Sequence, residues 1–450
     1  MTKSLNIIIC GAGLGGLGAA IALVRKGHRV IVLEAASKLN EVGAGIQIPP
    51  NSTRILQTYE LEEKIREKIV WPSNINFRRY ATGDVIGTTP LDPVMSEKYG
   101  YPYWLIHRAD YQRVLYDAAK EAGATILLGS PIESVEESES GPSIVLKDGR
   151  QFKGDLVVGA DGIRSKTRKT VLKENIEAIN SRNCAYRATI PAKVMNSDPA
   201  IAHLMTDINS NCWIGHERHI MAYPIRNGEL YNLVMSHPGQ ASVGRWNEPG
   251  DLDEMKKHYC NFDPIIQRVL EHVNSCLKWK LAYLPPLTKW VSDSGRVVLI
   301  GDAAHGMLPY LAQGAATSIE DGAALAECLD RVQDISDIPI MLQAFQAIRK
   351  PRCEAIASGA RANGDIWHMA DGPEQAQRDS EMRQEMDHSS PQTVLNPNKW
   401  SDKDFQPWLF GYDTVKLTNN FLDNYLAQPL GSEKDQLNTN RSRIQVISVH

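Results

Sequence analysis

One segment near the N-terminus constrains the fold more than any other feature of the chain. An apolar run at residues 5–10 leads directly into G-A-G-L-G-G at residues 11–16. Apolar residues then recur at helical spacing over residues 14–24, and a second apolar run at residues 30–33 ends on Glu34. This order predicts strand, glycine turn, helix and strand, which is the opening unit of a Rossmann-type parallel sheet.

The glycines of the turn have different expected tasks. Gly11 makes the tight turn, Gly13 lets the backbone approach a pyrophosphate, and Gly16 lets the helix pack against the strand. The Glu34 carboxylate is expected to accept hydrogen bonds from ribose hydroxyls, and its charge disfavours a 2′-phosphate. The segment therefore predicts a site for FAD or NAD rather than NADP, the alternative being a glycine-rich turn without a ligand.

Two later apolar runs also end on distinctive turns. The run at residues 156–158 leads into G-A-D-G-I-R-S, and the run at residues 297–300 leads into G-D. The three motifs in this order resemble the group A flavoprotein monooxygenases, the family of para-hydroxybenzoate hydroxylase and salicylate hydroxylase, over residues 5–365. The fungal salicylate hydroxylase-like and phenol-hydroxylating members are the most similar.

The resemblance implies a set of contacts around a tightly bound, non-covalent FAD. Asp302 would hydrogen-bond the ribityl chain, and Arg108 would contact the cofactor. Backbone near Gln47 would lie along the flavin ring. The helix that follows the G-D motif would direct free N–H groups near Gly314 and Ala315 toward the pyrimidine edge.

The reductant is expected to bind only transiently. Asp161 belongs to a motif that, in the family, touches both FAD and NAD(P)H, and Arg164 is a candidate for steering the nicotinamide cofactor. The chain has no second strand-borne G-x-G-x-x-G. The G-A-G at residues 43–45 runs into Pro49-Pro50, which we expect not to open a helix in the register of that motif. NAD(P)H would therefore have no Rossmann domain of its own.

The middle of the chain changes to alternating apolar and polar segments, typical of antiparallel strands. The predicted fold class is α/β, with a Rossmann-type FAD-binding domain, an inserted antiparallel β-sheet substrate domain and a C-terminal helical region. The expected boundaries are 1–180 plus 285–365 for the FAD-binding domain, 181–284 for the substrate domain, 366–430 for the helical region and 431–450 for a flexible tail. Within the helical region, one helix is expected at residues 414–426.

The segment from Trp213 to Pro224 is the candidate substrate strand. If it is one continuous strand, His216 lies on one face, which argues against a His-x-x-His zinc site, and no metal site is expected. The side chains on the other face would be Trp213, His219, Met221 and Tyr223.

Likeness to phenol-hydroxylating relatives makes Tyr223 and His219 candidates to accept or stabilise a phenol proton, and Arg187 a candidate anchor for the phenolate or a neighbouring carboxylate. In the alternative interpretation, Tyr223 and His219 are satisfied core residues and Arg187 belongs to a surface ion pair.

The resemblance implies an FAD-dependent monooxygenase that uses NAD(P)H and O2 to hydroxylate a phenolic or aromatic-acid substrate through a flavin C4a-hydroperoxide. One alternative is the same chemistry applied to an indole or alkene in secondary metabolism. Another is a non-redox binding module on a flavin fold, against which the joint presence of Asp302, Asp161 and Arg108 argues.

Composition limits the partners and the compartment. The 450 residues carry a net charge of −4, which predicts no nucleic-acid partner, and no apolar run is long enough to predict a membrane span. The seven cysteines are scattered singly, so a reducing compartment is favoured. We expect a cytoplasmic monomer or homodimer.

Overall fold

The computed structural model describes residues 2–39, 44–240, 247–384 and 396–427. Gly43 of the G-A-G segment and the tail predicted for residues 431–450 lie outside these ranges.

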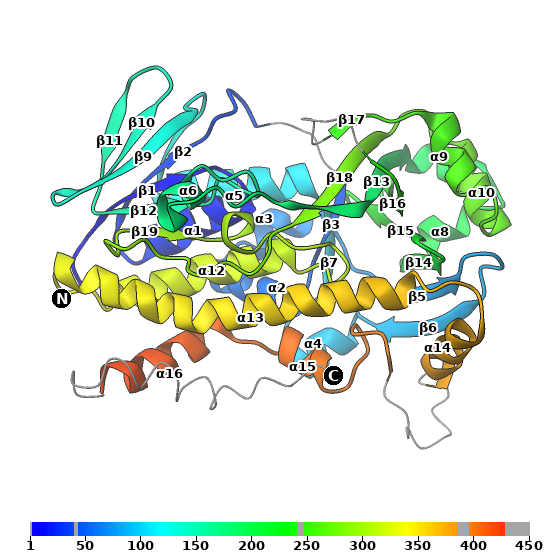
Figure 1. Cartoon of the computed structure of the whole chain (residues 1–450). Helices are drawn as coiled ribbons and strands as arrows, with labels where there is room; N and C mark the ends of the chain where they lie inside the picture. The colour runs from blue at the N-terminus through cyan, green and yellow to red at the C-terminus, as the bar shows by residue number, and fades with distance from the viewer. Residues whose placement is uncertain (1, 40–43, 241–246, 385–395, 428–450) are drawn as a thin grey trace.

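A five-stranded parallel sheet in the order β19-β12-β1-β2-β8 forms one half of the molecule (Figure 1). Its strands are β1 (Asn6–Cys10), β2 (Arg29–Leu33), β8 (Thr125–Leu127), β12 (Leu156–Gly159) and β19 (Val297–Leu299). The apolar runs that precede the three motifs, together with the run that ends on Glu34, are all strands of this sheet. The apolar runs are continuous because both faces of the sheet are covered.

Helices pack on this sheet and against one another. They are α1 (Leu14–Arg25), α5 (Arg108–Ala122), α6 (Thr167–Leu172), α12 (Gly314–Leu329) and α13 (Ile338–Trp367). Helix α1 contacts both α5 and α12, and the long α13 runs beneath both halves of the molecule in Figure 1. A small antiparallel sheet, β9 (Ile132–Ser138), β10 (Gly141–Leu146) and β11 (Gln151–Lys153), projects from the sheet's edge.

An eight-stranded sheet forms the other half, in the order β17-β18-β13-β16-β15-β14-β5-β6. Its strands are β5 (Asn74–Arg79), β6 (Val85–Pro90), β13 (Ile179–Pro191), β14 (Ser210–Gly215), β15 (Arg218–Ile225), β16 (Leu230–Pro238), β17 (Asn247–Pro249) and β18 (Leu277–Tyr283). Most of the sheet falls within the segment 181–284, but β5 and β6 come from much earlier in the chain. The predicted α/β fold class is confirmed.

The expectation of one continuous strand from Trp213 to Pro224 is wrong. Strands β14 and β15 form a hairpin whose turn contains His216 and Glu217. Glu217 adopts a left-handed φ of 54°, a position without the usual Gly or Asn signal. Trp213 pairs with Ile220 and so faces away from His219, while His219, Met221 and Tyr223 share a face as predicted.

As expected, no helix opens after Gly45 in the register of a second G-x-G-x-x-G turn, because the backbone there continues as a strand. Helix α2 (Pro50–Thr58) begins at Pro50, where a missing N–H costs nothing because the first helical N–H groups have no intrahelical partner. Gly45 starts strand β3 (Gly45–Ile48) instead of a phosphate-binding turn.

Short elements complete the two halves and the connection between them. They are α3 (Glu62–Arg66), β4 (Ile69–Val70), α4 (Val94–Tyr99), β7 (Trp104–His107), α7 (Ala192–Ser197), α8 (His203–Thr206), α9 (Leu252–His258), α10 (Pro264–Glu271), α11 (Asp302–His305), a 3-10 turn (Ile335–Asp337), α14 (Pro373–Gln384), α15 (Phe405–Phe410) and α16 (Thr414–Leu426). The predicted C-terminal helix coincides with α16, which packs on α12 and α13.

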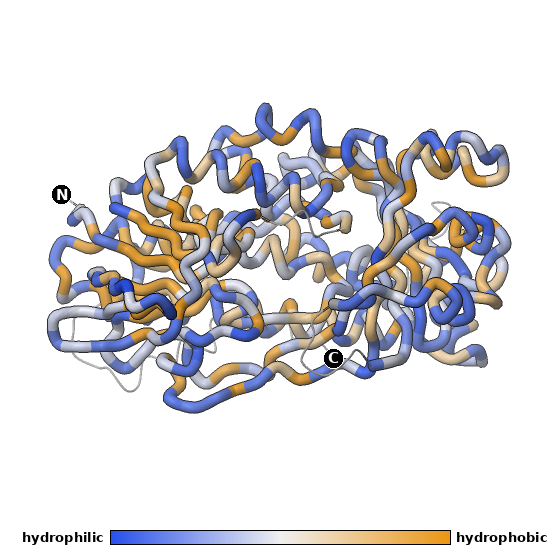
Figure 2. The backbone as a smooth tube through the Cα atoms, turned by 90° about the horizontal axis from the view of Figure 1, so that it is seen from above, coloured by the Kyte–Doolittle hydropathy of each residue, from blue (hydrophilic) through white to orange (hydrophobic). Residues whose placement is uncertain are grey.

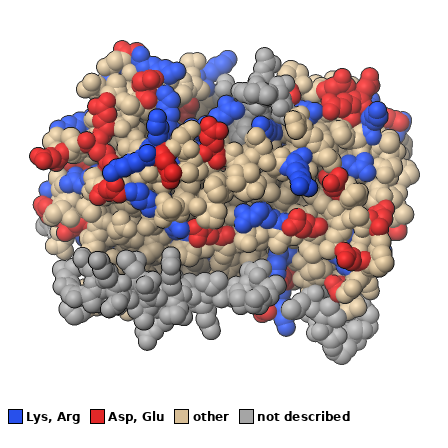
Figure 3. Space-filling model, viewed as in Figure 1, with Lys and Arg blue, Asp and Glu red and all other residues tan. Residues whose placement is uncertain are grey.

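Apolar residues gather on the inner strands, and the outer helices alternate between polar and apolar residues (Figure 2). Lys and Arg are intermixed with Asp and Glu over the face seen in Figure 3. Within the described ranges, no helix combines the length and apolarity needed to cross a bilayer.

Candidate cofactor and substrate site

One cavity of about 370 Å³ lies between the carboxyl ends of the parallel strands and the inner face of the large sheet. It is lined from both halves of the molecule. The predicted site residues that line it are Gly13, Gln47, Arg108, Arg187, His219, Tyr223, Asp302, Gly314 and Ala315. Gly11, Gly16, Glu34 and Asp161 do not line it.

The three glycines of the first turn have three different surroundings. Gly11 has a φ of +102°, and a Cβ there would lie 2.6 Å from the Ala160 carbonyl oxygen. A Cβ on Gly16 would lie 2.1 Å from the Gly11 carbonyl oxygen. A Cβ on Gly13 would meet no atom within 4 Å, because Gly13 opens onto the cavity. The turn thus keeps space clear for a ligand only at Gly13.

Two helices begin at the wall of this cavity. Helix α1 starts after Gly13 and helix α12 starts after Gln313, and neither N-cap residue contributes a side-chain hydrogen bond to its helix. The first N–H groups of each helix therefore have no intrahelical acceptor, and Gly15 and Ala315 line the cavity. Two positive helix ends in one space suit a pyrophosphate and an electron-rich ring, so the residues fit a bound FAD.

Arg108, at the start of α5, and Asp302, after β19, both line the cavity. Burial raises the pKa of Asp302, and the charges of His305 and Arg108 oppose this rise. Burial likewise lowers the pKa of Arg108, and Asp302 opposes that change. The charges of Arg108 and Asp302 therefore stabilise each other. The cavity thus holds a hydrogen-bond donor, Arg108, and an acceptor, Asp302, where the ribityl chain is expected.

The large sheet supplies the second wall of the cavity. Tyr223 and His219 on β15 are 2% and 4% exposed. Arg187 on β13 has a buried Nε without a hydrogen-bond partner, and its guanidinium carbon lies 5.5 Å from the Trp279 ring centroid. Burial lowers the pKa of Arg187, with Tyr223 opposing the effect and Arg108 adding to it.

Among the described residues, Arg187 forms no ion pair, so the surface ion pair considered from the sequence is wrong. A guanidinium at the cavity wall whose buried Nε has no partner favours an anion.

Comparison with known proteins identifies the family of the chain. Residues 4–360 match the FAD-binding domain family. The FAD-dependent monooxygenase OpS4 of Beauveria bassiana is 36% identical over 94% of this chain and 98% of its own length. The 3-hydroxybenzoate 6-hydroxylase 1 of Aquipseudomonas alcaligenes is 32% identical over 91% of this chain and 98% of its own length. The chain belongs to the FAD-dependent monooxygenases.

Solved structures share the fold of this monooxygenase. A salicylate hydroxylase in a substrate complex superposes with a TM-score of 0.77 at 22% identity, covering 95% of this chain and 99% of its own. The protein CtdE in complex with FAD and a substrate gives a TM-score of 0.79 at 22% identity, covering 94% of this chain and 98% of its own.

Two acidic residues predicted to touch ligands are bonded to the monooxygenase's own backbone. Asp161 accepts hydrogen bonds from Ser165 Oγ at 2.5 Å, Lys166 N at 2.8 Å and Thr167 N at 3.0 Å. It holds the start of α6, so contact with the cavity in this motif comes from Ala160 and Gly162 instead.

Glu34 accepts from Ala12 N at 2.7 Å and Ala36 N at 2.8 Å. Each of its oxygens has a second lone pair, which leaves capacity for a ribose hydroxyl. The ribose contact of Glu34 stays a prediction.

The C-terminal region also contributes to the cavity, which the sequence did not predict. Trp367, at the end of α13, and Trp400 line it. His368 follows Trp367, and its Nε2 lies 2.8 Å from His219 Nδ1. The chain shows aromatic residues after residue 400, but no local pattern indicates that they reach a sheet almost 200 positions earlier.

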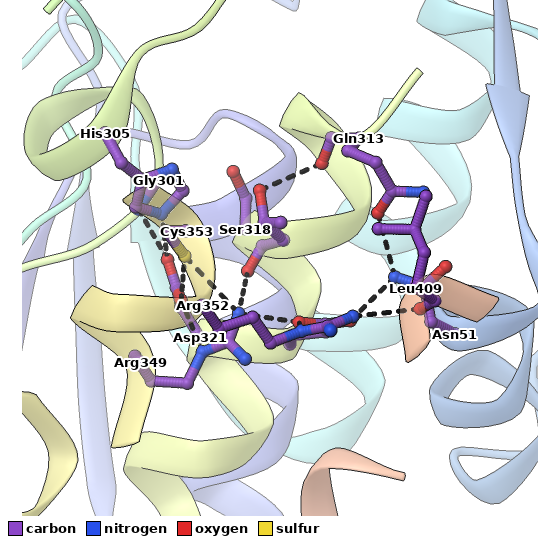
Figure 4. A network of polar contacts seen from close by, with 12 residues as sticks. Asn51, Gly301, His305, Gln313, Ser318, Asp321, Arg349, Arg352, Cys353 and Leu409 are labelled. Atoms are coloured by element: carbon purple, nitrogen blue, oxygen red, sulfur yellow. Dashed lines mark hydrogen bonds and ion pairs between the residues drawn. The ribbon is translucent and has the colours of Figure 1, made fainter. Parts of the chain in front are cut away.

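A buried ionic network holds the loop that carries Asp302 (Figure 4). The Asp321 carboxylate accepts from Gly301 N at 2.9 Å and from Arg349 Nε at 2.9 Å, and it bonds His305 Nε2 at 2.6 Å. Gly301 has a φ of 57°. Burial alone would raise the pKa of Asp321, but the charges of His305 and Arg349 outweigh it and hold that pKa at about 2.

His305, Asp321 and Cys353 place possible metal-ligand atoms within 4.8 Å of one another. The Arg349 guanidinium already shares the Asp321 carboxylate, and it also lies 2.7 Å from Glu320. A cation placed here would be repelled by this arginine, which favours an ion-pair network over a metal site.

Asp321→Asn is expected to lower the free energy of unfolding by about 1–3 kcal/mol, because His305 and Arg349 lose the buried charge that they share. It should also weaken FAD retention, because the bond that fixes Gly301 before Asp302 is weakened. Thermal unfolding and bound flavin per chain measure the two effects. Asp330→Asn, at the partly exposed end of the same helix, is the matched control and should cost less than about 1 kcal/mol. Equal losses in both variants would contradict a special role for Asp321.

Proposed function

We propose that this monooxygenase hydroxylates an aromatic acid that carries a phenolic hydroxyl, with NAD(P)H as the reductant and O2 as the oxygen source. The observation that carries this proposal is Arg187, which lines the same cavity as Tyr223 and His219 and forms no ion pair with any residue that the structure describes. A cation beside a tyrosine hydroxyl and an imidazole suits a substrate with both a carboxylate and a phenol.

The residues divide the work by their chemistry. Arg187 would bind the substrate carboxylate through charge-assisted hydrogen bonds. Tyr223 and His219 would hold the phenol hydroxyl and stabilise its ionised form, which makes the ring more electron-rich. Met221, Trp367 and Trp400 would contact the ring and exclude water.

The cofactor would supply the redox chemistry, with FAD taking electrons from NAD(P)H and activating O2 when it is bound. The chain's own part is to hold FAD by the two helix ends, Arg108 and Asp302, and to present the substrate ring to it. We expect the reductant to bind without a domain of its own.

The names of several relatives support this substrate class. Besides the 3-hydroxybenzoate 6-hydroxylase, a 3-amino-4-hydroxybenzoate 2-monooxygenase of Streptomyces cremeus is 33% identical over 86% of this chain, and a 6-hydroxynicotinate 3-monooxygenase of Pseudomonas fluorescens is 32% identical over 74%.

A second candidate is oxidation of an indole or alkene in fungal secondary metabolism. The observation that favours it is the aromatic wall of Trp367 and Trp400, which could take a larger apolar ring system. Such a substrate would leave Arg187 without an anion.

NAD(P)H oxidation across a matched panel separates the two candidates. The panel contains 3-hydroxybenzoate, salicylate, benzoate without the hydroxyl, phenol without the carboxylate, and indole. We expect the hydroxybenzoates to raise NAD(P)H consumption with little peroxide, and phenol to require far higher concentrations. Coupled turnover with indole alone would contradict the aromatic-acid proposal.

A further inference from the structure

His219 and His368 are in direct contact at the cavity wall. None of the residue roles proposed above depends on this contact. His219 Nδ1 and His368 Nε2 lie 2.8 Å apart, and the rings stack with centroids 5.1 Å apart and planes 25° apart. His219 lines the cavity and is 4% exposed, whereas His368 is only partly buried at the C-cap of α13. The pair therefore leads from the cavity wall toward the surface.

The surroundings keep both rings uncharged at rest. Burial and His368 lower the pKa of His219 well below its usual value. Burial, Arg378 of α14 and His216 of the β14–β15 turn lower the pKa of His368 to about 4. Tyr310 packs its ring edge-on against both histidines, and Glu217 donates its backbone N–H to the His368 carbonyl.

Two neutral imidazoles in contact must share one hydrogen, so one nitrogen donates and the other accepts. If His219 Nδ1 is the donor, its Nε2 carries a lone pair and can accept a proton from a ligand in the cavity. If His219 Nδ1 is the acceptor, its Nε2 carries hydrogen and can only donate.

We propose that His219 and His368 form a proton relay that moves the substrate's phenol proton from the cavity toward solvent, with His368 as its second catalytic member. The proposal rests on the proposed phenolic substrate. The phenol O–H bond breaks and its proton joins His219 Nε2, while the hydrogen on His219 Nδ1 passes to His368 Nε2. His368 becomes an imidazolium, the substrate becomes a phenolate, and His368 then releases its Nδ1 hydrogen to water.

The fold favours this direction of transfer. His368 caps the C-terminal end of the 30-residue helix α13, and its backbone N–H bonds the Gly364 carbonyl at 3.0 Å. The negative end of a helix stabilises a positive charge placed there. A transient imidazolium is therefore better stabilised at His368 than at His219, which is enclosed by Trp367 and Tyr310.

The first test needs no aromatic ligand. NMR of the FAD-loaded full chain with labelled histidine reports which ring nitrogens carry hydrogen. The relay requires hydrogen on Nδ1 of both His219 and His368 near neutral pH, and His219→Gln and His368→Gln assign the signals. Hydrogen on Nε2 of His219 would overturn the proposal, because that nitrogen could not accept the phenol proton.

The second test follows proton release with an indicator dye when the FAD-loaded chain is mixed with 3-hydroxybenzoate. His368→Gln keeps a hydrogen-bonding side chain but cannot carry the proton, so release should slow by on the order of 100-fold. His203→Gln, at an exposed histidine on α8, is the matched control and should release at the wild-type rate. Release at the wild-type rate in His368→Gln would also overturn the relay.

The methyl ether 3-methoxybenzoate separates transfer from packing, because it has no phenol proton. We expect His368→Gln to bind it with wild-type affinity, as followed by the flavin absorbance. A loss of affinity for this ligand equal to the loss of proton release would assign His368 a packing role and overturn the proposal. If the wild type bound neither ligand, the proposed function would be contradicted, and the NMR result would still decide the donor within the pair.

Discussion

Gly16→Ala is expected to prevent stable folding, whereas Gly13→Ala, three residues earlier, should fold and fail to hold FAD. A Cβ on Gly16 would lie 2.1 Å from the Gly11 carbonyl oxygen and 3.3 Å from the Ala160 Cβ, which leaves little room to relax. We expect a loss of at least about 3 kcal/mol in the free energy of unfolding. A Cβ on Gly13 meets no protein atom within 4 Å, so the fold has no reason to change.

The methyl group of Gly13→Ala would instead occupy the space reserved for the cofactor. Crowding of this kind costs about 1–3 kcal/mol, which corresponds to a loss of FAD affinity of roughly 5- to 150-fold. Circular dichroism of the apoprotein and flavin titration measure the two properties separately. A Gly13→Ala protein that held FAD as tightly as the wild type would show that the pyrophosphate does not lie at this turn.

Arg187→Met is expected to weaken the binding of hydroxybenzoates by about 30- to 1000-fold, the equivalent of 2–4 kcal/mol, while the FAD content stays unchanged. Methionine keeps much of the apolar volume and removes the charge that faces the cavity. Binding is followed by the change in flavin absorbance. Arg182→Met, an exposed arginine on the same strand, is the matched control and should bind as the wild type does.

A comparison of phenol with 3-hydroxybenzoate shows whether Arg187 acts on the carboxylate. Phenol has no carboxylate, so its affinity should be nearly the same in the wild type and the variant. If phenol and 3-hydroxybenzoate lost affinity equally, Arg187 would shape the cavity instead of anchoring a carboxylate.

The parts of the fold that sequence predicted are those set by short-range pattern. The strand, turn and helix at residues 5–34 and helix α16 follow from apolar spacing and turn chemistry within one segment. The β14–β15 hairpin was missed because Glu217 takes a left-handed conformation without a Gly or Asn signal. Helix α2 was missed because proline is tolerated at the first helical position.

The residues of the candidate site likewise include some that local sequence motifs indicated and some that only the tertiary structure reveals. Gly13, Asp302 and Arg108 lie in or beside motifs, so sequence indicated them and the structure brings them to one cavity. Asp161 was expected to face a ligand, but its carboxylate caps the backbone after its own motif. Trp367 and His368 could not be found because their place depends on how α13 crosses beneath the large sheet.

The central claim is that bound FAD and this cavity transfer one oxygen atom from O2 to an aromatic acid. The most direct measurement supplies the FAD-loaded protein with NAD(P)H, 3-hydroxybenzoate or salicylate, and isotopically labelled O2, and then analyses the aromatic product by mass spectrometry. The account predicts a hydroxylated product that carries one labelled oxygen atom, formed in proportion to the NAD(P)H consumed. NAD(P)H consumption that yields only peroxide with every hydroxybenzoate tested, or a product whose new oxygen comes from water, would contradict it.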